Sequence, residues 1–270
     1  MNEIIKVLNQ ASYKHSILNV FHDFTALMAL ELSAKTECLI KDVSKRIEKI
    51  KLIQQKYNEE ELICFRRFKE IIIHEITENR FQDFFGELFH ILELHNKYKG
   101  QFFTPYCLSY TAAKISIDIN TIKEIEKKDI SYIGEPACGS GGMCIAACQL
   151  LEDYNINYAS KIIIEANDID INCVYMSYIQ LSLIGAAARI NHKNTLSEEH
   201  FDDFITLAAI ANRSFKRLAL QKKAEQMLSI MKKFEAPAEI ERIVQKPENI
   251  IEEAIEKAED KKQEQYTFNF

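Results

Sequence analysis

The stretch GEPACGSGG, residues 134–142, holds four of the seven glycines of the chain beside an acid and a proline. Glycine adopts positive φ angles and lets a ligand lie against the backbone, and Gly139 and Gly141 come directly before a helical apolar pattern. The stretch lacks the lysine of a P-loop, and the Glu135 carboxylate would repel a phosphate. An acid at this place suits a ligand that carries an ammonium group.

A second acidic position follows in IIIEANDID, residues 162–170. Asp168 or Asp170 would lie at a strand end, where α/β nucleotide-binding folds place the acid that accepts hydrogen bonds from ribose hydroxyls. Asp168 lies 27 residues after Gly141, compared with about 20 in the usual dinucleotide fingerprint. A ribose and an ammonium group without a phosphate describe S-adenosylmethionine. The alternative is a glycine turn that only closes a strand-to-helix corner.

Alternating elements must position these residues. Apolar runs and helical spacing predict a strand near 131–134, a helix over 142–153, a strand over 161–166, a helix over 171–184 and a strand over 187–191. This alternation is typical of a parallel α/β sheet. Residues 1–97 have helical patterns throughout, another helix is expected from Tyr106, and the chain after Ser197 is expected to be helical to about Gln263.

Three segments occur in an order that resembles the adenine-N6 DNA methyltransferases, particularly the modification subunits of type I restriction systems. They are GQFFTP at 100–105, EPACGSGG at 135–142 and ANDIDINCVYMSYIQLSLIG at 166–185. The resemblance implies an α/β fold with a partial Rossmann-like, S-adenosylmethionine-dependent methyltransferase core. In this interpretation residues 1–97 form a helical domain, residues 98–203 the cofactor-binding core and residues 204–270 a C-terminal helical extension.

The resemblance also implies roles in binding S-adenosylmethionine. Phe103 and Thr104 would border the methionine end of the cofactor, and Asp168 would hold the ribose. Glu135 replaces the usual aspartate of the family. Asn194 stands where the family often has an aspartate near the exocyclic amine of the cofactor's adenine. The predicted cofactor residues are Phe103, Thr104, Glu135, Pro136, Ala137, Gly139, Gly141, Asp168 and Asn194.

Methyl transfer to adenine needs a further loop in this family, Asn/Asp-Pro-Pro-aromatic, whose polar groups bind the amine and whose ring stacks on the flipped base. The prolines of the chain are Pro105, Pro136, Pro237 and Pro247, and no two are adjacent. We therefore predict no catalytic residue. Three interpretations stay open: a cofactor-binding protein that is not catalytic by itself, an active subunit completed by a partner chain, and a non-enzymatic interaction or DNA-binding protein on a methyltransferase scaffold.

Charge and composition add further expectations. The net charge of −6 argues against a cationic coat, but a helical stripe of Arg213, Lys216, Arg217, Lys222 and Lys223 could face DNA, with a solvated helix face as the alternative. The final QYTFNF, residues 265–270, resembles the peptide by which replication proteins bind the sliding clamp. Scattered cysteines, histidines without metal-ligand spacing and the lack of a long apolar run predict a cytoplasmic protein with no metal and no membrane span.

Overall fold

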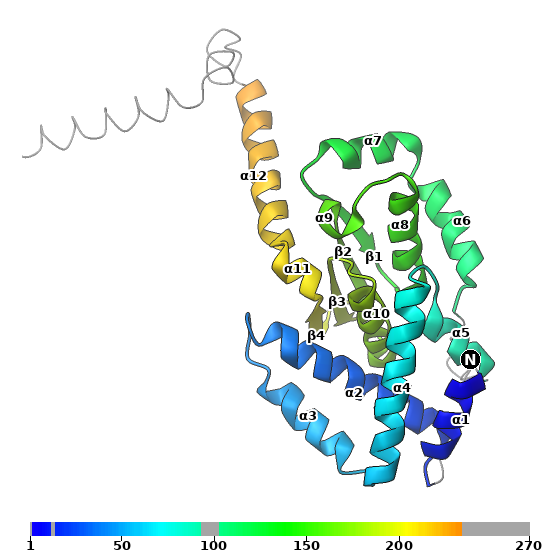
Figure 1. Cartoon of the computed structure of the whole chain (residues 1–270). Coiled ribbons are helices and arrows are strands. Elements are labelled where there is room, and N and C mark those ends of the chain that lie inside the picture. The colour runs from blue at the N-terminus through cyan, green and yellow to red at the C-terminus, as the bar shows by residue number, and fades with distance from the viewer. Residues whose placement is uncertain (1, 12–13, 93–102, 234–270) are drawn as a thin grey trace, which may run out of the picture. The chain divides into compact units, whose positions relative to one another are not determined.

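The computed structural model describes residues 2–11, 14–92 and 103–233 (Figure 1). Its residues group into two compact units, Met1–Ala219 and Leu220–Phe270. The clamp-like peptide at 265–270 and the first residues of the GQFFTP segment lie outside the described residues. The helix expected to continue to Gln263 is described as far as Lys233.

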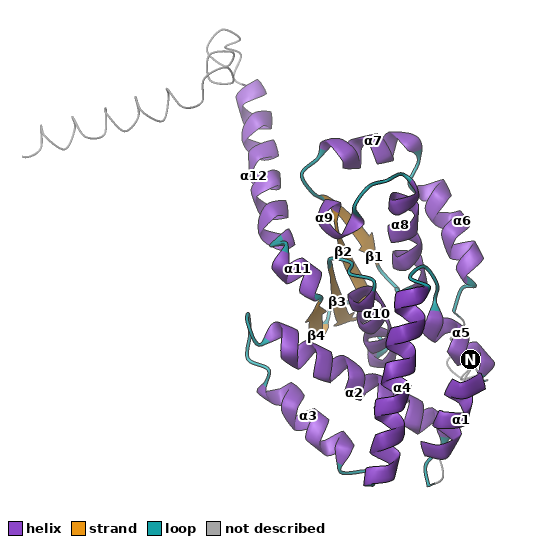
Figure 2. Ribbon diagram, in the orientation of Figure 1, coloured by secondary structure: helices purple, strands orange, loops and turns teal. Residues whose placement is uncertain are grey.

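The N-terminal part is helical, as the sequence pattern predicts (Figure 2). The N-terminal segment has few glycines and prolines that could end a helix, and capping side chains mark where separate helices begin. Ser16 and Asn58 each accept a backbone N–H in the first turn of their helices, and Asn58 forms a capping box with Glu61. The helices are α1 Asn2–Ala11, α2 Ile17–Glu37, α3 Ser44–Gln54, α4 Glu59–Glu78 and α5 Phe84–Ile91.

Helix α2 corrects one expectation about apolar runs. It has 21 residues and a mean hydropathy of 1.2, so by length and composition it is able to cross a membrane. Half of its apolar window is buried inside the protein, and the helix packs against α3 and against elements of the sheet layer. The core helix of a globular domain passes the same test of length and composition.

The predicted elements are all present: α6 Tyr106–Ser116, β1 Ser131–Glu135, α8 Gly142–Asp153, β2 Ile162–Asp168, α10 Ile171–Leu183 and β3 Ala188–Lys193. Two further helices, which the sequence pattern did not predict, lie between them: α7 Ile119–Lys127 and α9 Tyr158–Lys161. Strands β1, β2 and β3 are neighbours and run parallel, with Glu135 paired to Ala166 and Asp168 paired to His192. The carboxyl ends of the three strands therefore meet at one edge of the sheet.

The expectation that the chain is helical directly after Ser197 is wrong. Residues His200–Ile205 form a fourth strand, β4, which pairs antiparallel with β3, so the sheet is mixed rather than wholly parallel. The strand forms because its last two residues are buried on opposite faces, Phe204 in the larger core cluster and Ile205 in a smaller one. Helices α11 Leu207–Ala211 and α12 Ser214–Lys233 follow.

Different helices cover the two faces of the sheet. The larger cluster joins Ile164 and Ile190 of the sheet to side chains of α2, α4, α5, α8 and α10. The smaller cluster covers Ile163 and Ala187 of the opposite face with side chains of α11 and the first turns of α12. The N-terminal helices thus share one apolar core with the sheet, and the predicted boundaries at 97 and 203 stay a prediction.

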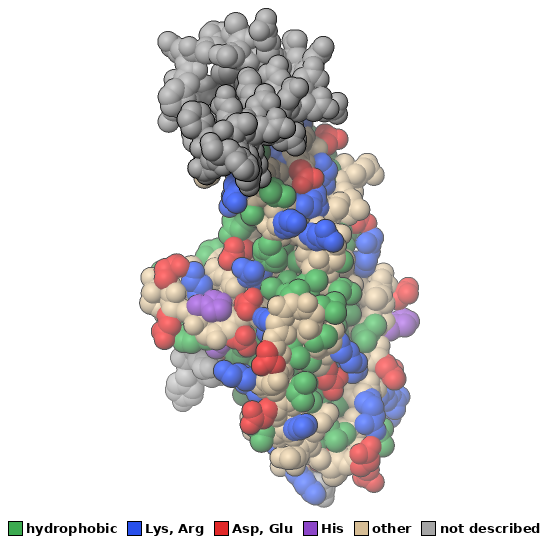
Figure 3. Space-filling model, turned by 90° about the vertical axis from the view of Figure 1, so that its left-hand side faces the viewer, with side chains coloured by type: hydrophobic (Ala, Val, Ile, Leu, Met, Phe, Trp, Pro, Cys, Tyr) green, Lys and Arg blue, Asp and Glu red, His purple; other side chains and the backbone are tan. Residues whose placement is uncertain are grey.

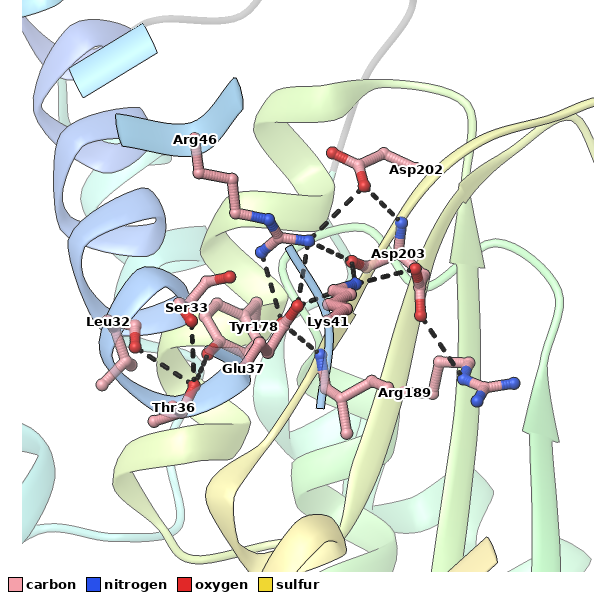
Figure 4. A network of polar contacts seen from close by, with 11 residues as sticks. Leu32, Ser33, Thr36, Glu37, Lys41, Arg46, Tyr178, Arg189, Asp202 and Asp203 are labelled. Carbon is pink, nitrogen blue, oxygen red and sulfur yellow. Dashed lines mark hydrogen bonds and ion pairs between the residues drawn. The ribbon is translucent and has the colours of Figure 1, made fainter. Parts of the chain in front are cut away.

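A buried polar network covers the outer edge of β4 (Figure 4). The Glu37 carboxylate of α2 accepts the Ile205 N–H at 2.8 Å and pairs with Arg46 of α3 at 3.1 Å. Arg46 and Lys41 both donate to the Asp203 carbonyl. An edge strand normally exposes unpaired backbone groups, and here helix side chains satisfy several of them.

Candidate cofactor site

The glycine turn lies between β1 and α8. Gly139 has φ +55° and Gly141 has φ +102°, and both angles belong to the left-handed region that favours glycine. A Cβ atom on Gly141 would lie 2.9 Å from the Ser177 hydroxyl of α10, so a side chain does not fit there. The Cys138 N–H donates to the Asn167 carbonyl at 2.8 Å and ties the turn to the end of β2.

Asp168 faces this turn from the last position of β2. Its Oδ2 accepts the Gly139 N–H at 2.9 Å, and its Oδ1 accepts the Asp170 N–H at 2.8 Å. Burial raises the pKa of the Asp168 carboxyl, while these backbone hydrogen bonds lower it. Asp170 instead caps α10, where it accepts the Asn172 N–H. Of the two acids that the sequence left open, Asp168 is therefore the one at the glycine turn.

Phe103 meets the same turn from the upstream segment. Its ring packs edge-to-face on Phe89 of α5 with centroids 5.0 Å apart, and its carbonyl lies 3.0 Å from His90 Nε2. A Cβ atom on Gly139 would lie 3.1 Å from the Phe103 ring, so the ring lies directly against the glycine. Thr104 is exposed. Segments 36 residues apart in the sequence, at 103 and 139, thus border one place.

The remaining predicted residues lie around the turn with different partners. Glu135 is half-buried and accepts the Ala137 N–H at 3.0 Å. Pro136 is exposed, and its carbonyl accepts the hydroxyl of Thr195, which lies in the connection from β3 to β4. Asn194 closes that connection: its Oδ1 accepts the N–H groups of residues 196 and 197 at 3.0 and 3.2 Å. The side-chain oxygen of Asn194 is therefore already used within its own turn.

Asp83 is a site residue that the sequence pattern did not reveal. It is 6% exposed, caps α5 through the Gly86 N–H, and accepts the Ser140 hydroxyl at 2.5 Å and the Gln180 amide at 3.0 Å. The amide of Gln180 also donates to the Ser140 carbonyl at 2.7 Å. An aspartate before an apolar run signals a helix cap, but nothing local signals that its second oxygen reaches the glycine turn.

The segment after β4 is where the family's catalytic loop is expected. Thr206 directly follows the strand, forms the N-cap of α11 and is fully buried. Its hydroxyl donates to the Ala186 carbonyl at 2.7 Å and accepts the Ala188 N–H at 2.9 Å, so it ties β4 back to β3. Residues Leu207–Ala211 continue as helix α11. A short apolar helix therefore follows the fourth strand, with neither adjacent prolines nor an aromatic residue in it.

The predicted basic stripe is only partly available to a partner. Arg217 pairs with Asp129 through two nitrogens at 2.7 and 2.9 Å and also donates to the Ser160 carbonyl. Arg213 and Lys216 are exposed, and in the second unit Lys222 and Lys223 are exposed. Figure 3 shows one face of the molecule, on which basic side chains alternate with acidic and hydrophobic ones. Within the described residues no group of three or more His, Cys, Asp or Glu side chains could hold a metal ion.

Comparison with known proteins agrees with these features. A type I restriction enzyme MjaIX methylase subunit of Methanocaldococcus jannaschii is 27% identical over 154 residues, which cover 55% of this chain and 25% of that protein. The chain thus spans about a quarter of the length of this relative. No solved structure matches the chain. The N-6 DNA Methylase family matches residues 77–246, which is more than half of the chain and includes the glycine turn, Asp168 and the four strands that the structure describes. The chain belongs to the N-6 DNA methylase family.

Proposed function

We propose that this protein binds S-adenosylmethionine at the glycine turn of a partial Rossmann-like core and does not methylate adenine by itself. The cofactor residues are those expected from the sequence: Phe103, Thr104, Glu135, Pro136, Ala137, Gly139, Gly141, Asp168 and Asn194. One observation carries the proposal: the Asp168 carboxylate and the Phe103 ring both contact Gly139, so three segments that are distant in the sequence border one place.

The chemistry of this place suits the cofactor. Each Asp168 oxygen accepts one backbone N–H and retains a lone pair for a ribose hydroxyl. The half-buried Glu135 carboxylate at the end of β1 attracts an ammonium group. Three carboxylates, those of Asp83, Glu135 and Asp168, contact residues 137–140 and disfavour a phosphate there. The same turn that cradles a phosphate in nucleotide-binding folds is therefore tuned to a ligand without one.

The proposal that the chain is not catalytic alone rests on the segment after β4. The family's loop brings a polar side chain and an aromatic ring to the flipped base. We assign the corresponding position to the turn from Thr206 into α11, because the loop is expected after the fourth strand, and the residues of α11 are leucine, alanine and isoleucine. None of these side chains can accept a hydrogen bond from the adenine amine.

A second candidate function is an active methyltransferase subunit completed by a partner chain. The relative's name, a methylase subunit, favours this candidate, because subunits act in assemblies. The partner would supply the base-binding loop, and DNA would be the substrate. A third candidate is a DNA-binding or interaction protein with an unused pocket. Among the described residues of the second unit, the exposed Lys222 and Lys223 support this candidate. In all three cases we propose a cytoplasmic protein.

Calorimetry with S-adenosylmethionine and S-adenosylhomocysteine tests the cofactor proposal. We expect saturable binding that Asp168→Ala weakens by about 1–3 kcal/mol, the usual cost of losing a buried hydrogen-bonded partner. Asp170→Ala is the matched control, because it removes the neighbouring carboxylate, which caps α10 and leaves Gly139 untouched. ATP serves as the phosphate-bearing comparison and should not bind. If neither S-adenosylmethionine nor S-adenosylhomocysteine produces binding heat at millimolar concentration, the proposal is refuted.

Methyl transfer is measured separately. Labelled cofactor and mixed-sequence DNA are incubated with the purified chain, and N6-methyladenine is quantified by mass spectrometry. We expect no product above background. Turnover by the isolated chain would show that residues outside the expected loop bind the adenine amine, and turnover only after addition of a second protein would favour the partner-completed candidate.

A further inference from the structure

Asp83 connects the helical N-terminal part of the chain to the glycine turn. Its carboxylate is the cap of α5, and the same two oxygens accept the hydroxyl of Ser140 and the side-chain amide of Gln180. Ser140 is 2% exposed and Gln180 is 1% exposed. The Gln180 carbonyl oxygen completes the group by accepting the Phe85 N–H at 3.3 Å. Three elements, α5, the turn and α10, therefore meet in one buried polar cluster.

The partners of Asp83 that the structure describes are neutral donors rather than cations. Burying a charge is costly, and here the compensation comes from hydrogen bonds and from helix N-termini. The carboxylate lies at the start of α5 and also beside Gly142, the first residue of α8, where an added Cβ atom would be 3.0 Å from Asp83 Oδ2. The N-cap residue of α8 is Gly141, which has no side chain to cap the helix. Asp83 thus places negative charge at the N-terminal ends of two helices.

A helix cap alone does not account for this arrangement. Asp118 caps α7 at the same three-residue spacing, since its Oδ1 accepts both the N–H and the hydroxyl of Thr121 at 2.8 Å. All the side-chain partners of Asp118 are local, within three residues along the chain. Asp83 differs in reaching Ser140 and Gln180, which lie 57 and 97 residues away. The bond to Ser140 holds the residue that lies between Gly139 and Gly141, the two glycines of the turn with positive φ.

We propose that Asp83 is a positioning residue for the cofactor turn, which acts through Ser140 and sets the affinity for S-adenosylmethionine. The inference rests on the proposed function for its ligand, whereas the positioning itself is a property of the ligand-free protein. When the Asp83–Ser140 bond is lost, residues 138–142 gain conformational freedom, and part of the binding free energy is used to order them again. The hydrogen bond from the Gly139 N–H to Asp168 is then less populated, and the ribose-binding carboxylate loses its fixed orientation.

Four variants of the full chain separate this role from a cap. Asp83→Ala removes both the cap and the bond to the turn, and Ser140→Ala removes only the bond. Asp118→Ala removes a comparable cap that has no contact with the turn. Asp83→Asn is the conservative variant, because its remaining oxygen still accepts the Gly86 N–H and the amide group can donate to the Ser140 hydroxyl.

Two measurements are made on each variant. The first is hydrogen exchange of the backbone amides at 139–144 without ligand, which tests the positioning directly. We expect exchange to rise about tenfold in Asp83→Ala and Ser140→Ala, the factor that corresponds to one lost hydrogen bond, and to stay unchanged in Asp118→Ala. The second is the Kd for S-adenosylhomocysteine, which we expect to rise by a similar factor in the same two variants and to recover in Asp83→Asn.

Each outcome has one meaning. Unchanged exchange at the turn in both Asp83→Ala and Ser140→Ala would overturn the proposal, as would a rise of equal size in Asp118→Ala. Raised exchange with an unchanged Kd would overturn the link to affinity. If the unmodified protein binds neither S-adenosylmethionine nor S-adenosylhomocysteine, the proposed function fails, and the exchange measurement alone decides whether Asp83 positions the turn.

Discussion

Removal of the Glu37 carboxylate is the sharpest test of how the helices hold the sheet. Glu37 is completely buried and lies 2.7 Å from Lys41, 3.1 Å from Arg46 and 2.8 Å from the Ile205 N–H. Substitution by alanine leaves Arg46, which is 5% exposed, without its most buried anionic partner. It also leaves the N–H of Ile205 in β4 without an acceptor, next to an apolar core.

The expected loss follows from these contacts. Breaking a buried ion pair by removing one partner costs about 3–5 kcal/mol, and an unsatisfied buried N–H costs about 1–3 kcal/mol. The two contributions overlap, because both come from the same carboxylate, so we expect Glu37→Ala to lower the free energy of unfolding by about 4 kcal/mol or more. That is a large part of the roughly 5–15 kcal/mol that stabilises a typical domain. Glu37→Gln should lose about half as much, because its amide oxygen still accepts the Ile205 N–H.

Urea denaturation followed by circular dichroism measures these differences. Glu31→Ala is the matched control, since Glu31 lies on the same helix and pairs with Lys69 at 2.8 Å, with both side chains about a third exposed. Surface pairs of this kind contribute about 0–1 kcal/mol. A loss in Glu37→Ala no larger than the loss in Glu31→Ala would refute the reasoning. Recovery of stability in the double variant with Arg46→Met would support it, because the buried guanidinium is then removed as well, and Lys41 keeps its ion pair with Asp203 at 2.9 Å.

Three further predictions follow from the fold. A 1–197 fragment should be insoluble or molten, because it lacks β4 and α11 and so exposes the edge of β3; a cooperative unfolding transition in the soluble fragment would contradict this. Charge reversal at Lys222 and Lys223 should leave thermal unfolding unchanged and weaken any DNA binding in a salt-dependent way. A DNA affinity that changes neither with salt concentration nor with the charge reversal would show that the two lysines belong to a solvated helix face. Hydrogen bonding to Arg217 lowers the pKa of Asp129 from its usual range, so this pair stabilises the fold at neutral pH and the contribution is lost as the pH falls through the lowered pKa. The ion pair should contribute less than about 1 kcal/mol, so Arg217→Met should cost less in strong acid than at pH 7, where the bond to the Ser160 carbonyl and the ion pair are both lost, as measured by thermal melts across pH.

Local sequence was sufficient for the elements that build the site. Apolar runs and a glycine turn predict strands, helices and the corner between them from local sequence, because strand and helix periodicity depend on neighbouring residues. The predicted helix over 142–153 coincides with α8, and the strand predicted to end at 166 ends at Asp168. The resemblance to N-6 methylases at Phe103, Gly139 and Asp168 was likewise readable from short segments, since the turn and the strand-end acid impose residue types at fixed places.

Only the tertiary structure decided the state of residues 200–205 and the role of Asp83. HFDDFI is short and half polar, so its local pattern favours no strand. It is a strand because β3 offers an edge for pairing and because Glu37, Lys41 and Arg46, more than 150 residues earlier, satisfy its outer edge. Asp83 has the local pattern of a helix cap, and its bond to Ser140 exists only because α5 packs against the turn. Both cases depend on partners distant in the chain, and no periodicity within one segment encodes a hydrogen bond to another.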